Sequence, residues 1–408
     1  MVGNKMTQRE VVITGMGVIT PIGLDVKTLT ESLRAGKTGL GPITSFDPAP
    51  YPFKSAYEVK GFDARHHGLQ ALDPFIQYAV AAAHQAVEDA RFDSGSVDPF
   101  TIGVSVSSSK GGMHTIDRFK DRLLRNPSAI LGARVYSSSV PNFAAQWIAR
   151  RWKVQGASKC YVAACATGTV AVIEGARMVS DGMVDYCIAG ASDASIVPLM
   201  LAGYKQMGVL DPDVLRPFDK RRKGFLVGEG AGIVFLETEE TARARGARIY
   251  GKILGHAYGN NATVSMVRYD DSEDSIARTV TGAVRSAGLD MTDIDYVNLH
   301  ATGTKSGDLY ETRQIKKAFG ASAGKIPMSA IKSMTGHMLG ASGAVEIIVS
   351  LIAMNEGFFP PTATLEQPDA ECDLDYVAGK SRPGRIDTAL TLSSGFGGHI
   401  AALTLGKA

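Results

Sequence analysis

The segment KCYVAACATGTVAVIEGARMVSDGMVDYCIAG, residues 159–190, sets out the order of elements that decides the fold. KCYVA is an apolar, strand-like piece, TGTVAVIEGARMVSDG has the length and composition of a helix, and DYCIAG is strand-like again. Continuous apolar strands separated by helices are typical of α/β proteins whose parallel sheets are covered by helices on both faces. The segment therefore predicts an α/β fold.

The same alternation continues along the rest of the chain. Further helices are expected where Asp73 and Pro74 provide a cap and a first helical position, and wherever apolar residues recur with helical spacing. The expected strands are 10–15 (ending at Gly15), 101–106, 248–258, 294–300, 388–395 and 399–405; the expected helices are 72–90, 140–152, 274–288, 307–320 and 340–357. The order of elements predicts two halves, residues 1–250 and 251–408, within one compact body.

Two of these helices, the one after Cys165 and the one starting near Gly340, are apolar or small on nearly every face. A helix that is hydrophobic all round is buried rather than laid on a surface. With one such helix in each half, the sequence predicts two sheets that sandwich a central helical layer.

Composition excludes several classes of protein. The 408 residues carry 43 Lys and Arg against 41 Asp and Glu, which gives no support to a general nucleic-acid binder. No secretory signal and no run of about 18 uncharged apolar residues is found, so no membrane span is expected. The four cysteines form neither a CxxC pair nor a metal set, which favours a reduced, cytoplasmic protein.

Cys165 lies between a predicted strand and a predicted helix. A thiol at a helix N-terminus lies at the positive end of the helix dipole, which favours the thiolate, and free N–H groups there can stabilise an oxyanion. A lone cysteine is more often a core residue, and Cys160, Cys187 and Cys372 are interpreted in that way. Cys165 is a candidate nucleophile only if a base lies elsewhere in the chain.

Two histidines are candidates for that base. VNLHATGTKSGD places His300 at the end of a strand, and IKSMTGHMLGASG places His337 in a glycine-rich loop, five residues after Lys332. Strand ends and the loops after them often carry the chemistry of α/β folds. Each histidine alone fits a hydrogen-bonded core residue equally well, but the set with Cys165 is hard to explain as packing.

The chain resembles the elongating β-ketoacyl-acyl-carrier-protein synthases (synthase II-like) of the thiolase superfamily. The resemblance runs in one order through REVVITGMGVITPIG, AACATGTVAVIEGA, LRPFDKRRKGFLVGEGAG, VNLHATGTKSGD, KSMTGHMLGASGAVE and GFGGH. It implies a thiolase fold with two pseudo-duplicated halves in a five-layer αβαβα body. It also implies a homodimer that binds acyl carrier protein and neither nucleic acid nor membrane.

The resemblance assigns roles to six residues of the reaction centre. Cys165 would be the nucleophile, and its N–H with that of Phe396 would form an oxyanion hole. His300 and His337 would donate N–H bonds to the malonyl thioester carbonyl and stabilise the enolate left by decarboxylation. Glu346 would hold Lys332, which orders His337.

The resemblance also assigns binding residues. Thr302 and Thr304 match hydroxyls that hold the pantetheine arm, and Phe225 matches an aromatic residue near the malonyl carboxylate, although simple packing explains it equally well. Lys110 lies where relatives often carry an apolar residue that bounds the acyl pocket. Residues that fit carrier-protein docking are Arg134, Lys205 and Arg65. No metal or resident cofactor is implied, because phosphopantetheine arrives with the carrier protein.

The chain departs from the family in its last motif, where Leu392, Ser394 and Ile400 replace Asn, Phe and Asn. These changes imply different packing and hydrogen bonds in the loop of Phe396, and Lys110 favours a specialised pathway of fatty acid or polyketide type. Lys110 could shorten the pocket, pair with a polar acyl group or point outward.

Rival interpretations fit these residues less well. A dinucleotide enzyme is rejected, because GMGVIT has Thr20 where the fingerprint needs glycine and Pro21 where it needs a helix. A thiolase or a starter-type synthase does not match the paired histidines as closely. The remaining alternative is a chain-length-determining partner subunit of a heterodimeric ketosynthase, although such subunits typically lack the cysteine.

Overall fold

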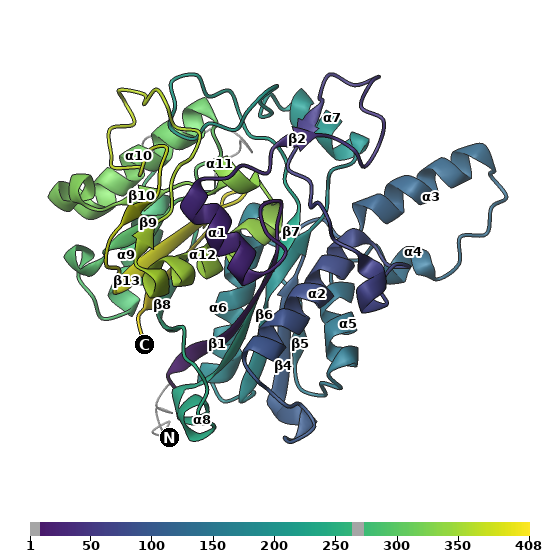
Figure 1. Ribbon diagram of the computed structural model, residues 1–408, viewed down its shortest axis with the longest axis horizontal. Coiled ribbons are helices and arrows are strands. Elements are labelled where there is room, and N and C mark those ends of the chain that lie inside the picture. The colour runs from purple at the N-terminus through teal and green to yellow at the C-terminus, as the bar shows by residue number, and fades with distance from the viewer. Residues whose placement is uncertain (1–8, 263–272) are drawn as a thin grey trace.

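The computed structural model describes residues 9–262 and 273–408, and its backbone is organised around ten hydrogen-bonded strands (Figure 1). Their order is β10-β9-β13-β14-β8-β1-β7-β6-β4-β5. The strands are β1 (Val11–Ile19), β4 (Ile102–Ser107), β5 (Ser158–Lys159), β6 (Tyr186–Asp193), β7 (Gly230–Thr238), β8 (Gly251–Asn260), β9 (Tyr296–Asn298), β10 (Met328–Ser329), β13 (Thr388–Ser394) and β14 (His399–Gly406). Two short ribbons pair β2 (Gly41–Pro42) with β3 (Ser55–Ala56) and β11 (Phe358–Phe359) with β12 (Arg382–Pro383).

The ten strands divide into two halves with the same internal pattern. In the first half β5, β4 and β6 are parallel, and β7 and β1 follow antiparallel. In the second half β10, β9 and β13 are parallel, and β14 and β8 follow antiparallel. Three residue pairs between β1 and β8 join the halves. The expected pseudo-duplication is confirmed, but the expectation of purely parallel sheets is wrong, since two strands of each half run the other way.

Helices form three layers around these strands. One hydrophobic cluster holds α2 and α5 against β4, β6 and β7, and another holds α9 and α10 against β9, β13 and β14. A third cluster packs α6 and α12 between the inner faces of the two halves. The expected five-layer αβαβα body is therefore confirmed. The helices are α1 (Val26–Ala35), α2 (Pro74–Asp89), α3 (Met113–Arg125), α4 (Arg134–Ser137), α5 (Phe143–Arg151), α6 (Thr167–Ser180), α7 (Pro198–Gln206), α8 (Glu239–Ala244), α9 (Ser275–Ser286), α10 (Lys305–Phe319), α11 (Lys332–Thr335) and α12 (Ser342–Glu356).

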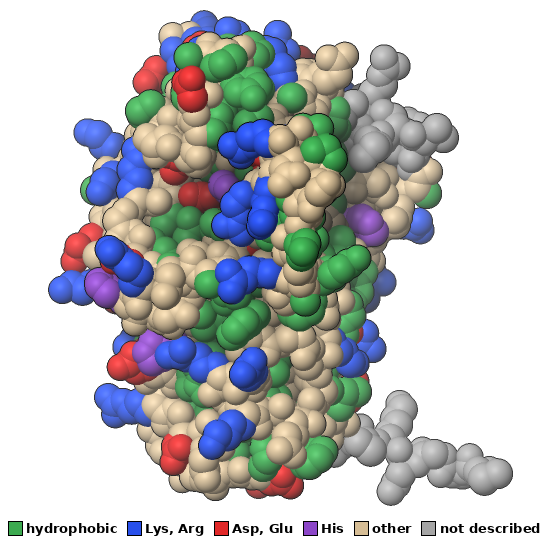
Figure 2. Space-filling model, turned by 90° about the vertical axis from the view of Figure 1, so that its right-hand side faces the viewer, with side chains coloured by type: hydrophobic (Ala, Val, Ile, Leu, Met, Phe, Trp, Pro, Cys, Tyr) green, Lys and Arg blue, Asp and Glu red, His purple; other side chains and the backbone are tan. Residues whose placement is uncertain are grey.

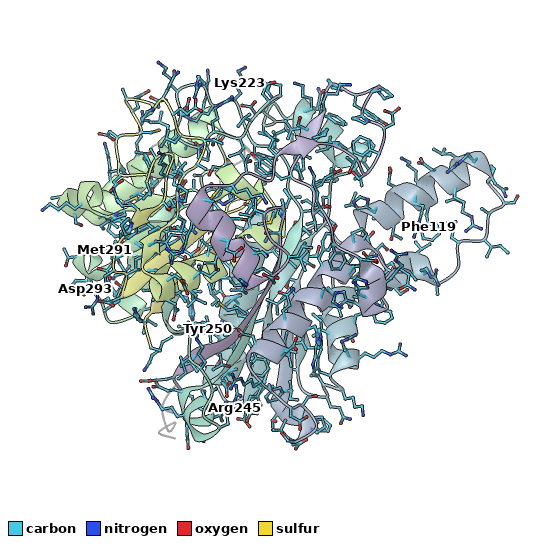
Figure 3. All side chains as sticks on the ribbon, viewed as in Figure 1. Phe119, Lys223, Arg245, Tyr250, Met291 and Asp293 are labelled. Atoms are coloured by element: carbon cyan, nitrogen blue, oxygen red, sulfur yellow. The ribbon has the colours of Figure 1, made fainter. Side chains whose placement is uncertain are left out.

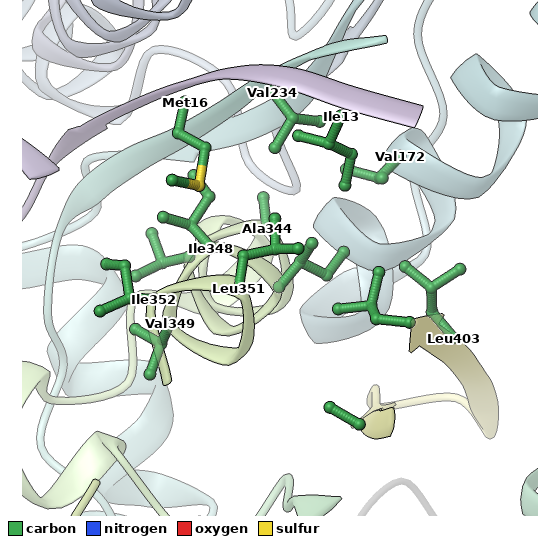
Figure 4. Packing of buried hydrophobic residues seen from close by; sticks show 14 of the residues in the cluster. Ile13, Met16, Val172, Val234, Ala344, Ile348, Val349, Leu351, Ile352 and Leu403 are labelled. Carbon is green, nitrogen blue, oxygen red and sulfur yellow. The ribbon is translucent and has the colours of Figure 1, made fainter. Parts of the chain in front are cut away.

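The central helices approach each other very closely. A Cβ on Gly168 of α6 would stand 2.6 Å from the carbonyl oxygen of Gly340, and one on Gly343 of α12 would stand 2.2 Å from Oγ1 of Thr169. Only glycine fits at such contacts. Figure 4 shows the apolar side chains of α12, among them Ile348 and Leu351, packed between Ile13 and Val234 of the first half and Leu403 of the second.

Among the described residues, one helical segment, Leu339–Glu356, is long and apolar enough to cross a membrane by length and composition. Of its residues, 89% are buried inside the protein. Its apolar composition is thus accounted for by its place in the central layer.

Some expected boundaries are wrong. β1 does not end at Gly15 but continues to Ile19, with a register shift against β7 between Ile13 and Gly15 that lets the strand bend and go on. The strand predicted for KCYVA shrinks to Ser158–Lys159, since the chain then turns away toward α6. The cap at Asp73 is confirmed, because its carboxylate accepts the Phe75 N–H and Pro74 is the first residue of α2.

Helices α3 and α4 project from the first half, at the right of Figure 1. The connection that carries them leaves large apolar side chains exposed, and the second half has no counterpart of this projection in the residues described. These exposed side chains are Ile116, Leu123, Leu124, Ile130, Tyr136 and Val140.

Candidate active site

Cys165 lies in a single 3-10 turn, Ala164–Ala166, that leads directly into α6. The turn begins with Ala164 at φ +47°, a left-handed conformation that is uncommon for a residue with a side chain and is a frequent feature of functional sites. The loop after β13 packs against it, since a Cβ on Gly395 would stand 3.1 Å from the Cys165 nitrogen. The turn therefore presents the thiol to a neighbour from the opposite half.

His337 is that neighbour. Its Nε2 is 3.1 Å from Cys165 Sγ, and its Nδ1 is 3.2 Å from Oγ of Ser342, the first residue of α12. A serine hydroxyl can donate or accept, so Ser342 supports either tautomer of the ring. Cys165 and His337, 172 residues apart in the chain, form the nucleophile–base contact that the sequence required.

His300 completes the histidine pair. Its ring lies edge-on to that of His337, with the centroids 5.6 Å apart. Glu311 of α10 fixes the backbone beneath it by accepting the N–H of His300 at 2.7 Å and of Ala301 at 2.8 Å. The two rings meet at right angles beside the thiol.

Both imidazoles are neutral in this environment. Burial, followed by the positive charge of Lys332, holds the pKa of His300 and of His337 well below the usual 6.5. Lys332 is fully buried and is ion-paired with Glu346, whose pKa burial raises and the lysine lowers. The expected pair is thus present, and each neutral ring keeps one N–H that it can donate.

The thiol of Cys165 differs from expectation. Burial raises its pKa to about 11, although Lys110, Lys332 and the Phe396 backbone N–H act in the opposite direction. Burial therefore acts against the thiolate that the helix start is expected to favour, because the charged sulfur loses its hydration. His337 Nε2 lies where it can receive the proton of the thiol.

A cavity of about 410 Å³ opens onto these groups. Thr302 and Thr304 line it, and their hydroxyl oxygens are 3.4 Å apart. Phe225 lines the cavity and also packs in the core, with its ring edge-on to that of His337 at a centroid distance of 5.0 Å. The packing interpretation and the interpretation as a cavity residue are therefore compatible. Phe396, partly buried, lies on the same wall.

Two lysines that the sequence had not singled out also line the cavity, Lys223 and Lys305. Both are exposed, and Figure 3 places Lys223 at the upper end of the molecule, far from Tyr250. Lys223 belongs to the basic run DKRRKG, residues 219–224. Among the described residues, no three His, Cys, Asp or Glu side chains are grouped so that they could hold a metal ion.

The remaining predicted residues lie outside this cavity. Lys110 is partly buried in the loop after β4, whereas Arg134 of α4 and Lys205 of α7 are exposed. Arg65 is exposed but bound through its guanidinium to Asp63 at 2.7–3.1 Å, which reduces its use as a free docking charge. Figure 2 looks onto the side that carries α3 and α4, where basic side chains gather between hydrophobic ones.

One buried carboxylate near the site escaped the sequence analysis. Asp193, at the end of β6, is fully buried and accepts hydrogen bonds from Ser108, Ser109, the Lys110 N–H and the Gly340 N–H. It thereby ties the loop of Lys110 to the start of α12. Its place at the carboxyl end of a parallel strand was the signal that could have found it.

The comparisons with known proteins agree with this geometry. The model of the β-ketoacyl synthase N-terminal domain matches residues 8–242, and that of the C-terminal domain matches residues 250–366. The chain belongs to the β-ketoacyl synthase family. This β-ketoacyl synthase is 38% identical to 3-oxoacyl-[acyl-carrier-protein] synthase 2 of Synechocystis sp., over 98% of this chain and 99% of that one. It is 36% identical to the synthase of the same name from Staphylococcus aureus, over 98% of each.

Solved structures of ketosynthases from polyketide-type systems are also similar to this β-ketoacyl synthase. It superposes on the ishigamide ketosynthase/chain length factor with a TM-score of 0.93 at 34% identity, covering 98% of this chain and 100% of that one. The TM-score is 0.89, at 28% identity and the same coverage, for a type II polyketide ketosynthase in complex with its acyl-carrier protein and bound to the hexaketide. The chain is thus a condensing acyltransferase of the fatty acid and polyketide type.

Proposed function

We propose that Cys165, His300 and His337 of this chain carry out decarboxylative Claisen condensation between an acyl thioester and malonyl-carrier protein. The observation that carries the proposal is the 3.1 Å contact between His337 Nε2 and Cys165 Sγ, with His300 alongside and both rings neutral. The cavity with Thr302 and Thr304 supports a role for these hydroxyls in holding the pantetheine arm.

In the first half-reaction, Cys165 Sγ bonds to the acyl carbonyl carbon and its proton passes to His337 Nε2. The carbonyl oxygen becomes an oxyanion, for which the backbone N–H groups of Cys165 and Phe396 are the proposed donors. The bond from that carbon to the pantetheine sulfur then breaks. The departing sulfur takes the proton back from His337, which leaves an acyl-enzyme and a neutral ring.

In the second half-reaction, malonyl-carrier protein enters the emptied cavity. The bond between its carboxylate and methylene carbons breaks, carbon dioxide leaves, and the electron pair moves onto the thioester oxygen as an enolate. N–H groups of His300 and His337 stabilise that oxygen, where charge appears only as the reaction proceeds. For this step the single ring proton of His337 lies on Nε2, and Nδ1 accepts from the Ser342 hydroxyl. The enolate carbon bonds to the acyl carbon, and the bond to Cys165 Sγ breaks. The released thiolate takes up a proton from solvent, which regenerates the thiol. Lys332, paired with Glu346, acts as a positioning residue for His337.

The partner in both steps is proposed to be an acyl carrier protein, as in the solved complex of a related ketosynthase. Carrier proteins are acidic, so exposed cations are expected to steer them. The exposed Arg134 and Lys205 support this role, and Arg65 contributes less because Asp63 binds it.

A homodimer is proposed from the apolar side chains exposed on the α3–α4 projection, which are the kind that subunit interfaces bury. We further propose a division of the halves at residue 250, a cytoplasmic location, and no resident cofactor or metal beyond the phosphopantetheine that the carrier brings. Sedimentation, limited proteolysis, cell fractionation and elemental analysis test these points in turn.

The test of the proposed function is intact mass after incubation with hexanoyl-carrier protein, followed by addition of malonyl-carrier protein. The expected result is a gain of one acyl group on the wild type and none on Cys165→Ala, and then loss of that group with appearance of a 3-oxoacyl product. A folded protein that gains no acyl group from any carrier thioester would overturn the proposal.

One observation favours a second candidate, a chain-length-determining partner subunit. The structural neighbour with a TM-score of 0.93 is the ishigamide ketosynthase/chain length factor, whose name joins an active chain with a partner of that kind. A chain-length-determining chain would need a different active chain for turnover. Mass photometry of the purified protein alone, with turnover measured on the same sample, separates the two candidates.

A further inference from the structure

The cavity that leads to Cys165 opens at the protein surface beside two lysines. Of the residues that line it, Cys165 is buried, Thr302 and Thr304 are partly buried, and Lys223 and Lys305 are exposed. No Asp or Glu is among the described residues that line this cavity. The outer end of the cavity therefore carries two positive charges and no negative charge on its wall.

The buried Arg222 joins the two segments that carry these lysines. It belongs to the same basic run as Lys223, and its side chain is 3% exposed. Its guanidinium donates to the carbonyl oxygens of Thr304 at 3.3 Å and of Lys305 at 2.9 Å. The basic run is thus fastened to the start of α10, and both lysines reach the same cavity from neighbouring backbones.

Two glycines show how close these backbones are. A Cβ on Gly303 would stand 2.8 Å from the carbonyl oxygen of Gly224, and the two residues have φ values of +75° and +147°. A residue with a side chain would be strained at both positions. Because Gly224 follows Lys223 and Gly303 lies between the two threonines, this contact places Lys223 next to the hydroxyls proposed to hold the pantetheine arm.

The carboxylates nearest to this contact are already bound. Those of Asp219 and Asp369 pair with arginines of the basic run, at 2.8 and 2.6 Å. Within residues 9–262 and 273–408, Nζ of Lys223 and of Lys305 takes part in no hydrogen bond and no ion pair. Two exposed ammonium groups held close together in this way attract an anion that arrives with a ligand.

The chemistry of the substrate identifies that anion. A phosphopantetheine arm carries the thioester at one end and a phosphate at the other. Since the thioester must reach the buried Sγ of Cys165, the phosphate lies toward the exposed end of the same cavity, where Lys223 and Lys305 stand. This direction of the arm is the same whether the phosphate is attached to a protein or not.

We propose that Lys223 and Lys305 form a phosphate site that lets this protein accept acyl groups from free phosphopantetheine thioesters, without a carrier protein. The inference rests on the proposed function, because the acyl group is transferred to Cys165. Sγ bonds to the acyl carbonyl carbon, the bond from that carbon to the pantetheine sulfur breaks, and the thiol proton passes through His337 to the departing sulfur. Two sources share the phosphate chemistry: phosphopantetheine itself and the diphosphate of coenzyme A.

The experiment measures acyl loading by intact mass from three free thioesters at equal concentration: hexanoyl-pantetheine, hexanoyl-phosphopantetheine and hexanoyl-coenzyme A. We expect loading from hexanoyl-phosphopantetheine to be roughly fivefold to tenfold faster than from hexanoyl-pantetheine, the gain expected when two exposed lysines bind one phosphate. This ratio should fall as salt is added, because exposed charges are screened. The rate with hexanoyl-coenzyme A tells whether the site takes a diphosphate as well as a single phosphate.

Matched variants make the test specific to the two lysines. Lys223→Met combined with Lys305→Met should bring the ratio of the two rates to about one, whereas Lys223→Arg combined with Lys305→Arg should retain the preference. Lys220→Met is the control, since it removes an exposed charge from the same basic run at a position that does not line the cavity, and it should keep the wild-type ratio.

Three results would overturn the inference. They are equal loading from the phosphorylated and unphosphorylated arms in the wild type, an unchanged ratio in the double methionine variant, and loading from hexanoyl-carrier protein but from no free thioester. Loading from neither the carrier-bound nor the free thioesters would instead overturn the proposed function.

Discussion

The two halves of the molecule share one scaffold but contribute different chemistry. In the first half, β5 is followed by a 3-10 turn that starts with Ala164 at φ +47° and then by α6. In the second, β10 is followed by the short helix α11, then by a 3-10 turn that starts with Leu339 at φ +51°, and then by α12. Superposing the two turns matches Cys165 with Gly340, which offers no side chain for catalysis.

The match runs the other way for the base. Counting back from the same turns, His337 corresponds to Val162, whose side chain is 57% exposed. Thus, at each of the two matched positions, one half carries a reactive side chain and the other half carries glycine or valine. Duplication supplies two facing helix starts, and the proposed roles assign the nucleophile to one and the base to the other, so that the proposed site forms at their junction.

The largest expected effect comes from removing the nucleophile. Cys165→Ala makes this position resemble Gly340, the matched position of the second half, which has no reactive side chain. The variant should lower the rate of condensation by roughly 10⁴-fold or more, because no acyl-enzyme can form. Turnover of malonyl-carrier protein with an acyl primer measures this. Retention of the thermal midpoint is the control, and an active Cys165→Ala protein would contradict the comparison.

Substitution of the two histidines should affect different half-reactions. His337 touches Sγ, whereas His300 has no hydrogen bond to it in the described structure. His337→Ala should slow both acyl loading and condensation, while His300→Ala should leave loading nearly unchanged and lower condensation by roughly 10²–10³-fold, the loss typical of one oxyanion donor. Rapid-quench mass spectrometry follows each step. Equal slowing of loading in both variants would show that the halves are not specialised in this way.

The buried carboxylates of the two halves offer a stability contrast. Glu346 in the second half is paired with Lys332, whereas Glu229 in the first half accepts the Val59 N–H and the Tyr78 hydroxyl and has no cationic partner among the described residues. Lys332→Met should destabilise the fold by about 3–5 kcal/mol, since it leaves a charged partner unpaired in the core. The double variant Lys332→Met with Glu346→Leu should recover most of that loss but not activity. Denaturant melts of both variants test this.

Glu229 gives the smallest effect, with a defined pH dependence. Burial raises its pKa to about 7 from the ordinary 4.5. The folded protein therefore holds a proton on Glu229 that the unfolded chain has released between these values, so the contribution of Glu229 to stability is greatest at low pH and falls as pH rises toward 7. Glu229→Gln should flatten that slope and stabilise the protein at pH 8 by roughly 1–3 kcal/mol. An unchanged slope between pH 5 and 8 would contradict this.

Much of the fold was predictable because its main determinants are local. The run AVAAAHQAVEDA with its Asp73 cap and the largely apolar run after Gly340 predict helices without reference to the rest of the chain. The direction of β7 and β1 was not predictable, since a buried apolar strand has the same sequence pattern in either orientation. The end of β1 was missed because Gly15 looks like a stop but lies at a bulge.

The site was predictable as a set of residues and less so as an environment. Cys165, His300, His337 and Lys332 stand out by residue type and by position near strand ends. The raised pKa of the thiol was not foreseeable, since it depends on burial by parts of the chain far apart in sequence. A short repeat was also overlooked: CATGTV (165–170) and GASGAV (340–345) align once the turns are superposed.

The paired glycines of that repeat, Gly168 and Gly343, have a consequence for how the enzyme fails and how it can be controlled. They set the two central helix starts in contact, so the reacting atoms are carried by the most tightly packed part of the molecule. Inactivation by heat and collapse of the core should therefore be one event. Loosening these helices therefore cannot serve to control the rate. Control is left to the loop of Phe396 and its flanking glycines, which lines the cavity in front of Cys165.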